Sequence, residues 1–475
     1  MAEKKSIRSK LWKVAKILAL VVGIVIVLIV SAFYILTDPV NDTPFYETQY
    51  FRKSCVMVDS LKKITTVSED SIQAGFSKVS ITPSLNNSAD HFQEGKFVQV
   101  PLAGFGKREG KPATGIHDSV FVKAVAVKVG AKRVVFVGAD LLIMPPNIID
   151  TVSLILEKQG INREEVFYSA THSHSSIGAW IPGFLGKQFA GESNESVQKW
   201  LVQQISTAVI KAIADLRPAH LGYGIFNAEK YTRNRLIDTL GVKNNDFCYV
   251  ALQQIKGKKA VIGSFSAHST TMNASNMEVS ADYPGFWARK MEKTSVDLAV
   301  FFAGSVGSQS PVAEGEGFEK PRFIGESLAD SLNTHLNYTH FLDKIQLTTV
   351  TVKIPLPEFQ VRISRHRCLI PWAGSKLSPV PDNSCVQALR LGDMVWITTP
   401  ADFSGEYAVQ IKNNLAVKGF QANVSSFNGS YLGYIIPGRY YNMDQYESQT
   451  MGWYGPAMGD YTVDLIRKIS DLVTL

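Results

Sequence analysis

The sequence is poor in cysteine. Its 475 residues include only Cys55, Cys248, Cys368 and Cys385, too few for a disulfide scaffold in a domain of this size. No Cys-x-x-Cys motif occurs, which excludes the common zinc-finger and thiol redox sites. Cys368 and Cys385 could pair with each other if the compartment is oxidising.

Several catalytic signatures are also missing. The chain has no His-Glu-x-x-His motif, no Gly-x-Ser-x-Gly nucleophile elbow and no P-loop, so the sites that these motifs build are not indicated. The glycines between Ala103 and Gly110 miss the dinucleotide-binding spacing by one residue, and we interpret them as a loop that borders a pocket. The absence of internal repeats and low-complexity tracts favours one large domain, although two tightly packed lobes are also compatible with this length.

Positive charge is scarce outside the N-terminus. The formal net charge is +7, and residues 1–16 alone contribute +5 through six Lys and Arg against one Glu. The rest of the chain is therefore almost neutral, which argues against the basic surface of a nucleic-acid-binding protein. We expect no nucleic-acid partner.

The chain does have one long apolar run. Residues 17–36 carry no charge and match the roughly 20 residues that span a bilayer. The preceding Lys and Arg predict a cytoplasmic tail over residues 1–16, a transmembrane anchor over 17–36, and a periplasmic or extracellular domain. A cleaved secretory signal is the alternative, for which Ser31-Ala32-Phe33 is a poor cleavage site and the run is long.

After the apolar run, residues 37–70 are polar and predict a stalk or linker with a short helix near Phe51–Lys63. Residues 71–475 have an α/β pattern, which predicts a single large catalytic domain with mixed β-sheets flanked by helices. The expected strands are Val120–Val129, Val134–Ala139, Val166–Ala170, Val261–Ala267, Leu298–Ala303 and Met394–Thr399. The expected helices are Asn147–Lys158, Ser196–Leu216, Tyr283–Glu292, Phe323–Leu336, Ser404–Ala416 and Asp460–Leu472.

Reactive side chains follow the ends of several expected strands. His172 and His174 follow one strand at a spacing of two residues, which on extended backbone directs both rings to the same side. His268 and Asp402 follow two other strands, and loops at carboxyl strand ends meet where α/β sheets bind ligands. Imidazoles and a carboxylate suit zinc with an open position for water. The pattern alone leaves a metal site and ordinary hydrogen-bonded loop histidines equally open.

A family resemblance extends through the expected domain. Its blocks are Ala74–Pro83, Gly115–His117, Val134–Asp140, Thr171–Ser175, Ala267–Asn273, Tyr431–Tyr434 and Gln445–Glu447. In this order they resemble the neutral/alkaline (non-lysosomal) ceramidases. The resemblance implies a zinc-dependent amidohydrolase that cleaves the N-acyl bond of ceramide, or of a similar lipid, to a sphingoid base and a fatty acid. The immunoglobulin-like domain usual at the C-terminus of that family is not expected here.

The resemblance also implies roles for individual residues. His172, His268 and Tyr434 would bind zinc, with Asp402 as the carboxylate ligand. His174 would act beside the metal as a general acid and base. Tyr446 would polarise the substrate carbonyl together with an arginine, assigned to Arg235 with Arg233 as the competitor. Ser310, which precedes Pro311, matches the active-site serine of the family.

Two departures from the family keep alternatives open. The family has Glu where this chain has Asp402, and the block around Ser310 differs at Ser308 and Val312. One alternative is a metal-dependent hydrolase of another envelope amide or ester, and another is an inactive membrane-tethered binding protein. Asp402 would also serve as a helix N-cap, Ser310 as a turn residue, and the tyrosines as core residues. The sequence does not indicate an oligomeric state.

Overall fold

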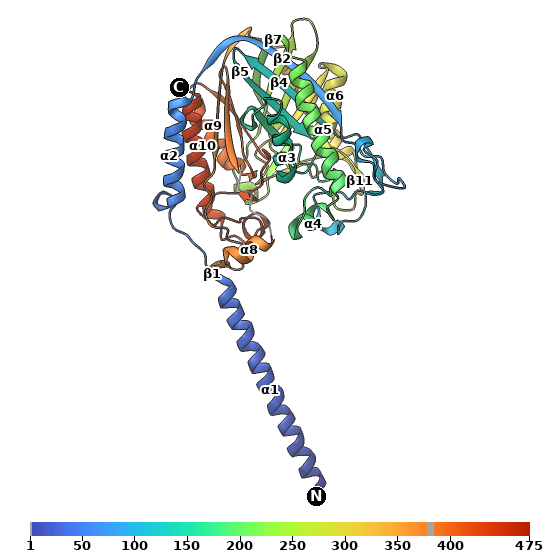
Figure 1. Cartoon of the computed structure of the whole chain (residues 1–475), viewed down its shortest axis with the longest axis vertical. Helices are drawn as coiled ribbons and strands as arrows, with labels where there is room; N and C mark the ends of the chain where they lie inside the picture. Colours follow the sequence, from blue (N-terminus) through green and yellow to red (C-terminus); the bar gives the residue numbers. More distant parts are fainter. Residues whose placement is uncertain (1, 378–383) are drawn as a thin grey trace.

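The computed structural model describes residues 2–377 and 384–475; Met1, at the start of the predicted basic tail, lies outside them. An α/β domain stands at the end of a long N-terminal helix, α1 (Ala2–Leu36), which projects away from it (Figure 1). From Lys10 onward this helix is apolar and long enough to cross a bilayer, and its most apolar window is not buried in the domain. The apolar helix of a secretory signal also meets these criteria of length and composition, so both interpretations of residues 17–36 remain open.

The domain is organised around a mixed sheet of twelve strands. Its main path runs β12-β10-β9-β7-β2-β14-β16-β17-β19, and β4, β5 and β6 branch from β2. The strands are β2 (Ser68–Ser80), β4 (Phe121–Val129), β5 (Lys132–Ala139), β6 (Val166–Ala170), β7 (Arg217–Asn227), β9 (Asp246–Gln254), β10 (Lys259–Phe265), β12 (Leu298–Ala303), β14 (Lys344–Lys353), β16 (Cys385–Leu391), β17 (Met394–Thr398) and β19 (Gln421–Ser425). All six predicted strands are present, and the predicted mixed α/β fold is confirmed.

The sheet folds over itself, because β2 is long enough to pair with different strands along its length. Residues 72–80 pair with β4, whereas residues 68–71 pair with β14. One core cluster therefore draws on β4, β5, β10, β12 and β17. At its centre the fully buried Phe136 ring lies 5.9 Å from Phe302 and 5.7 Å from Trp396. Strands covered on both faces are apolar along nearly their whole length, as β4 and β5 are.

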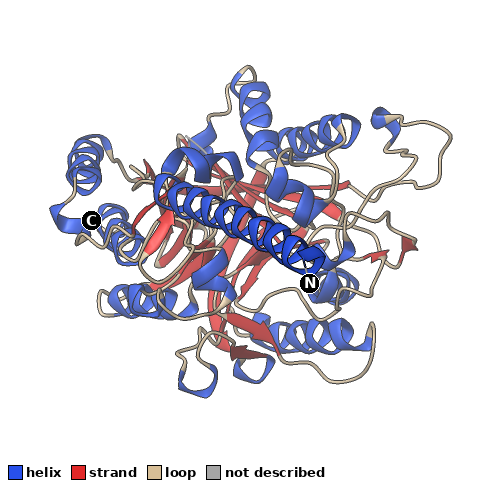
Figure 2. Ribbon diagram, turned by 90° about the horizontal axis from the view of Figure 1, so that it is seen from below, coloured by secondary structure: helices blue, strands red, loops and turns tan. Residues whose placement is uncertain are grey.

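Helices cover the outer faces of the sheet (Figure 2). One group packs on β4 to β6, a second on β9, β10 and β12, and a third on β14 to β19. They are, in that order, α3 (Pro146–Glu157) with α5 (Glu195–Ala214), α6 (Asp282–Thr294) with α7 (Glu319–Leu336), and α9 (Gly405–Ala416) with α10 (Met458–Val473). Each predicted helix of the domain is found, with ends shifted by a few residues.

The interval 37–70 is not a free polar stalk in this structure. Its helix α2 (Gln49–Ile64) packs on α10, with the Tyr50 and Tyr461 rings 4.8 Å apart and Val58 buried. The strand β2 already begins at Ser68. The polar average of this interval hides an amphipathic helix, whose apolar side packs on the domain while its charged side faces solvent. The linker between the apolar run and the packed domain is therefore shorter than residues 37–70. The anchor over residues 17–36 stays a prediction.

The cysteines form no disulfide. Cys55, Cys248, Cys368 and Cys385 all lie in described segments and all have free thiols. The pairing of Cys368 with Cys385 that the sequence permits is therefore not found.

Candidate active site

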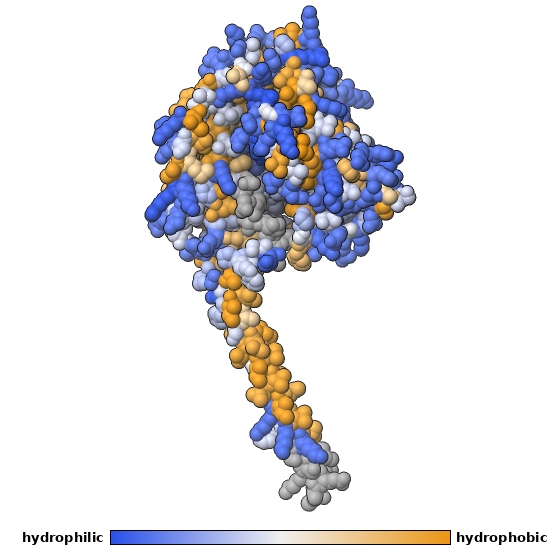
Figure 3. Space-filling view, in the orientation of Figure 1, coloured by the Kyte–Doolittle hydropathy of each residue, from blue (hydrophilic) through white to orange (hydrophobic). Residues whose placement is uncertain are grey.

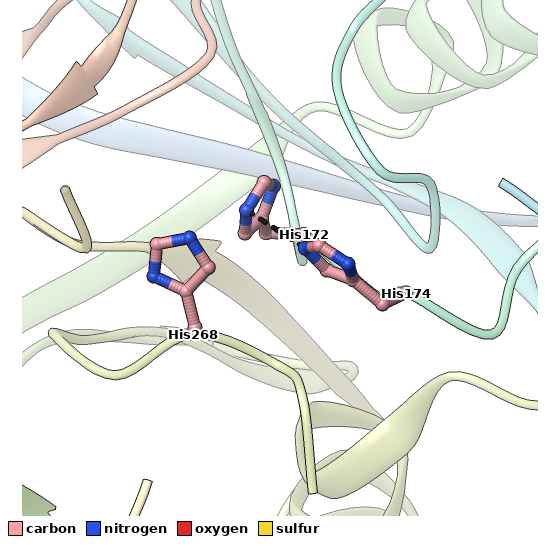
Figure 4. A group of neighbouring side chains, drawn as sticks. All are labelled: His172, His174 and His268. Atoms are coloured by element: carbon pink, nitrogen blue, oxygen red, sulfur yellow. Dashed lines mark hydrogen bonds between the residues drawn. The ribbon is translucent and has the colours of Figure 1, made fainter. Parts of the chain in front are cut away.

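Three histidine rings meet beyond the carboxyl ends of two strands. β6 ends at Ala170 and leads to His172 and His174, while β10 ends at Phe265 and leads to His268. One nitrogen from each ring lies within 4.8 Å of the others. Figure 4 shows the rings approaching one another from two loops. The juxtaposition expected from the strand ends is thus present.

The backbone at His172 is strained. Its φ of +60° lies in the left-handed region, which costs a non-glycine residue about 1–2 kcal/mol. The ring is held by a stacking contact with Phe427, 4.3 Å between centroids, and by a hydrogen bond from Nδ1 to the Leu142 carbonyl of 2.7 Å. Strain of this kind accumulates at functional sites, where the surrounding structure maintains it.

Both His172 and His268 present Nε2 as an acceptor. His268 Nδ1 donates to the Val306 carbonyl at 2.8 Å, as His172 Nδ1 does to Leu142. Burial lowers the pKa of His172 to about 3 and that of His268 well below its usual value. Both rings are therefore neutral near pH 7, with the proton on Nδ1 and a lone pair on Nε2.

Asp402 completes this group. It lies on β18 (Asp402–Phe403), which pairs in parallel with β20 (Tyr434–Ile435) so that Asp402 stands opposite Tyr434. Its Oδ1 is 3.4 Å from His172 Nε2 and 3.3 Å from His268 Nε2. Its Oδ2 accepts a hydrogen bond of 2.7 Å from Tyr431. Burial raises the pKa of Asp402. The neighbouring His172 and the Tyr431 hydroxyl act in the opposite direction and favour the ionised carboxylate.

These residues fit a metal ion. Asp402 Oδ1 is buried and accepts no hydrogen bond from the residues that the structure describes. It nevertheless faces the Nε2 lone pairs of His172 and His268. Acceptors that face one another without a proton between them repel, and a cation among them removes the repulsion. Imidazole nitrogen with carboxylate oxygen suits Zn²⁺. The backbone carbonyls bound to Nδ1 are the outer partners that orient metal-ligating histidines.

A charged network adjoins the group. The Tyr434 hydroxyl is 3.0 Å from His268 Nε2 and accepts a hydrogen bond of 2.9 Å from Arg235 Nη2. Arg235 Nε also donates to Glu447 at 2.7 Å. Burial raises the pKa of Tyr434 well above its usual value, and Asp402 raises it further while Arg235 opposes the shift. The structure thus brings Arg235 to the site, whereas Arg233 is exposed.

His174 differs from the other two histidines. Its Nε2 is 3.3 Å from His172 Nε2, but its Nδ1 has no hydrogen-bond partner in the described part of the chain. Its backbone carbonyl is fixed by the buried Arg108 guanidinium. Gly104 lies against its other side, where an added Cβ would stand 2.7 Å from His174 Cα and Cβ. The backbone is therefore fixed while the ring lacks the second anchor that His172 and His268 have.

A cavity of about 870 Å³ opens above these residues. Tyr446 lies at its wall, 43% exposed, with its ring 5.7 Å from Tyr434. It begins a π-helical turn, Tyr446–Thr450, a feature that is frequent at functional sites. The other walls are mainly apolar and include Phe105, Leu142, Ile143, Trp180, Ile181, Pro182, Phe189, Met451 and Trp453. A polar floor under apolar walls suits a long apolar substrate with one polar linkage.

Ser310 is not part of this arrangement. It lies on β13 (Gln309–Pro311), opposite Arg233 on β8 (Thr232–Asn234), and is not among the described residues that line the cavity. The departures at Ser308 and Val312 are likewise not among the described residues that line the cavity. Ser308 Oγ accepts a hydrogen bond from Gly405 N at 3.0 Å, and Val312 is 40% exposed. The chemical role that the resemblance implies for Ser310 therefore stays a prediction.

Three further side chains contribute to the site. Tyr431 binds Asp402, Glu447 binds Arg235, and Phe427 stacks on His172. Tyr431 and Glu447 do lie inside the blocks that resemble the family, next to the residues singled out there. Nothing in the sequence indicates Phe427, because its partner lies in a distant segment.

Two sequence comparisons match ceramidases. A model of the neutral/alkaline non-lysosomal ceramidase N-terminal region matches residues 93–316, a range that contains His172 and His268 but ends before Asp402. The neutral ceramidase of Pseudomonas aeruginosa is 22% identical in an alignment 457 positions long, which covers 76% of this chain and 68% of that protein.

Solved structures share the fold. The crystal structure of the Pseudomonas aeruginosa neutral ceramidase matches with a TM-score of 0.67 at 19% identity, covering 84% of this chain and 75% of that one. A structure described as ceramidase complexed with C2 matches with a TM-score of 0.69 at the same identity and coverage. Taken with the sequence matches, these findings support a hydrolase related to the neutral/alkaline non-lysosomal ceramidases.

Proposed function

We propose that this protein is a zinc-dependent amidohydrolase that cleaves the N-acyl bond of ceramide, or of a closely similar lipid, into a sphingoid base and a fatty acid. The observation that carries the proposal is the buried group of His172 Nε2, His268 Nε2 and Asp402 Oδ1, which face one another at the floor of an apolar cavity. The relationship to the ceramidases supports the choice of substrate.

His172, His268, Asp402 and Tyr434 would hold the ion. When bound, zinc supplies a Lewis acid that polarises a carbonyl and activates water near neutral pH. Asp402 is one methylene shorter than the glutamate of the family, yet its Oδ1 already lies within 3.4 Å of both Nε2 atoms. The shorter side chain is therefore no reason to infer an inactive binding protein.

His174 is suited to move protons. Its ring is neutral, because burial lowers its pKa well below the usual value, with the neighbouring histidines adding to the shift. It can accept a proton from the attacking water and return it to the amide nitrogen as the C–N bond breaks. The direct products are the neutral amine and the carboxylic acid, and the acid then gives its proton to the amine or to solvent.

Tyr446 and Arg235 would stabilise the negative charge that develops on the carbonyl oxygen. Both line the cavity beside Tyr434. Preorganised donors at such a position typically contribute about 10²–10³ in rate. Glu447 holds Arg235 in place through its 2.7 Å contact. Ser310 has no step in this scheme.

Substitution of His268 tests the proposal. The full chain, purified in detergent, should contain about one zinc per molecule by elemental analysis and release fatty acid from ceramide. His268→Gln should lose both, whereas His335→Gln should keep both, because His335 binds the Ser331 carbonyl on α7, outside the cavity. Hydrolysis that persists in protein stripped of metal would overturn the mechanism.

We also propose that α1 is retained as a single-pass anchor with its N-terminus in the cytoplasm. The basic residues before the apolar run support this orientation. Protease added to intact cells or spheroplasts should then degrade the domain and leave the N-terminal tail protected. Protection of the domain instead would reverse the topology.

A further inference from the structure

The end of α1 is bound to the domain rather than merely linked to it. β1 (Thr37–Pro39) pairs antiparallel with β15 (Arg367–Leu369) directly after the helix. Ile370 N donates to the Leu36 carbonyl at 3.0 Å, and Val40 N donates to the His366 carbonyl at 3.0 Å. Residues 362–377, here called the collar, contain β15 and the short helix α8 (Pro371–Leu377).

The Arg367 side chain binds the chain where α1 ends. Its Nε donates to Thr37 Oγ1 at 2.7 Å, and its Nη2 donates to the Thr37 carbonyl. The guanidinium also lies 4.9 Å from the Tyr34 ring and 5.6 Å from the Phe33 ring, within the range of cation–π attraction. The contacts to Phe33 and Tyr34 would be lost if the helix were removed, so they favour its retention.

The collar is in turn bound to the wall of the cavity. Arg362, which is buried, donates from Nη2 to the Met443 carbonyl at 2.8 Å and from Nη1 to the Tyr441 carbonyl. Arg365 contacts Asp444 at 3.3 Å. The next residues along the chain, Gln445 to Glu447, line the cavity. A continuous set of contacts therefore joins the end of α1 to the cavity wall.

Large apolar side chains are exposed around this end of the domain. Trp372 on α8 is 64% exposed, Phe184 on α4 (Phe184–Ala190) is 58% exposed, and Ile363 is 42% exposed. Both α4 and α8 lie at the end from which α1 leaves (Figure 1). The apolar surface of α1 runs up to this end of the domain in the space-filling view (Figure 3). Residues of α4 also line the cavity.

The position of Trp372 sets its depth relative to a membrane. It follows Ile370, whose amide binds the last residue of the apolar helix. A bilayer that surrounds α1 up to Leu36 therefore ends at the level of the collar. Trp side chains concentrate at this depth, where the ring meets the headgroup region.

We infer that the collar and the start of α4 lie in the headgroup region of the bilayer that α1 spans, and that the cavity receives its lipid directly from this leaflet. The inference rests on the proposed function for the anchor and for a lipid substrate. The partner is the bilayer surface itself. The acyl chains would pass from the leaflet onto the apolar cavity walls without crossing bulk water, where exposure of their CH₂ groups is unfavourable.

Quenching of Trp372 fluorescence tests the orientation without using catalysis. The full chain is reconstituted in phosphatidylcholine vesicles that contain lipids brominated near the headgroup. The emission lost in Trp372→Phe, taken as the difference from the unsubstituted protein, should be quenched by these lipids. Emission from Trp372 that is insensitive to bromine would overturn the inference, whatever the enzyme hydrolyses.

A second experiment tests delivery from the leaflet. Trp372→Ser should lower the hydrolysis of long-chain ceramide in the same vesicles roughly tenfold, equivalent to about 1.4 kcal/mol. It should leave hydrolysis of a short-chain, water-soluble ceramide unchanged. Tyr338→Ser is the control, because Tyr338 is 85% exposed and follows α7. Equal losses on both substrates would refute delivery from the bilayer, whereas no hydrolysis by the unsubstituted protein would refute the proposed function instead.

Discussion

Removing the hydroxyl of Tyr431 isolates the contribution of Asp402 to metal binding. Tyr431 donates to Asp402 Oδ2 at 2.7 Å, while Oδ1 faces the two histidines at 3.3 and 3.4 Å. Tyr431→Phe leaves the ring and its packing but deprives the buried carboxylate of one donor. A hydrogen bond to a charged group contributes about 1.5–3 kcal/mol, and loss of an outer partner typically weakens metal binding about 10- to 100-fold.

The dissociation constant for zinc should therefore rise about 10- to 100-fold, which is about 1.4–2.7 kcal/mol at 1.36 kcal/mol per tenfold. Competition with a chromophoric chelator measures it directly. Tyr407→Phe is a matched control, since Tyr407 donates to Asp460 at 2.6 Å and neither residue is among the described residues that line the cavity. It should lower thermal stability and leave zinc affinity unchanged. An unchanged affinity in folded Tyr431→Phe would show that Asp402 does not hold the ion.

Three further substitutions follow from the packing and the charges. Gly104→Ala places a Cβ 2.7 Å from His174 at a φ of +111°, so hydrolysis should fall about 10²-fold while zinc content is retained; a fully active variant would contradict the role of His174. Phe302→Ala removes a fully buried ring from the sheet core and should cost about 3–5 kcal/mol in urea unfolding, and a loss below 1 kcal/mol would contradict the described packing. Burial raises the pKa of Asp140 from 3.8 to about 6, so the folded state binds its proton more tightly than the unfolded state does. The stabilisation from this group is complete below about pH 4 and is lost as the pH rises through 6, and Asp140→Asn should flatten this part of the profile of unfolding free energy against pH; an unaltered profile would exclude the assignment.

The strands and helices of the domain were predictable because their patterns are local. β4 and β5 are apolar along their lengths, and α10 alternates apolar and polar residues with the helical period. The convergence of His172, His174 and His268 was also predictable, since each follows a strand end. Asp402 likewise follows a strand end, and resemblance to the family added Tyr434, which stands opposite Asp402 in the pairing of β18 with β20.

The remainder depends on contacts between distant segments. The packing of α2 on α10 was missed because the composition of residues 37–70 is polar on average and only one side of the helix is buried. The stacking of Phe427 on His172 joins residues that no local pattern relates. The role that the resemblance implies for Ser310 stays a prediction, and the pairing of β13 with β8 places this residue outside the described residues that line the cavity.

The pairing of β18 with β20 constrains the order in which the chain folds and binds its metal. Each strand has only two residues, and a pair this short has no independent stability. Asp402 and Tyr434 can therefore face each other only after β17, α9 and the returning chain have assembled around them. Because such long-range pairing is slow relative to local structure, the ion would enter a nearly finished domain instead of nucleating one. Metal uptake would then follow the completion of folding. The bound ion would stabilise the folded protein by mass action without accelerating folding.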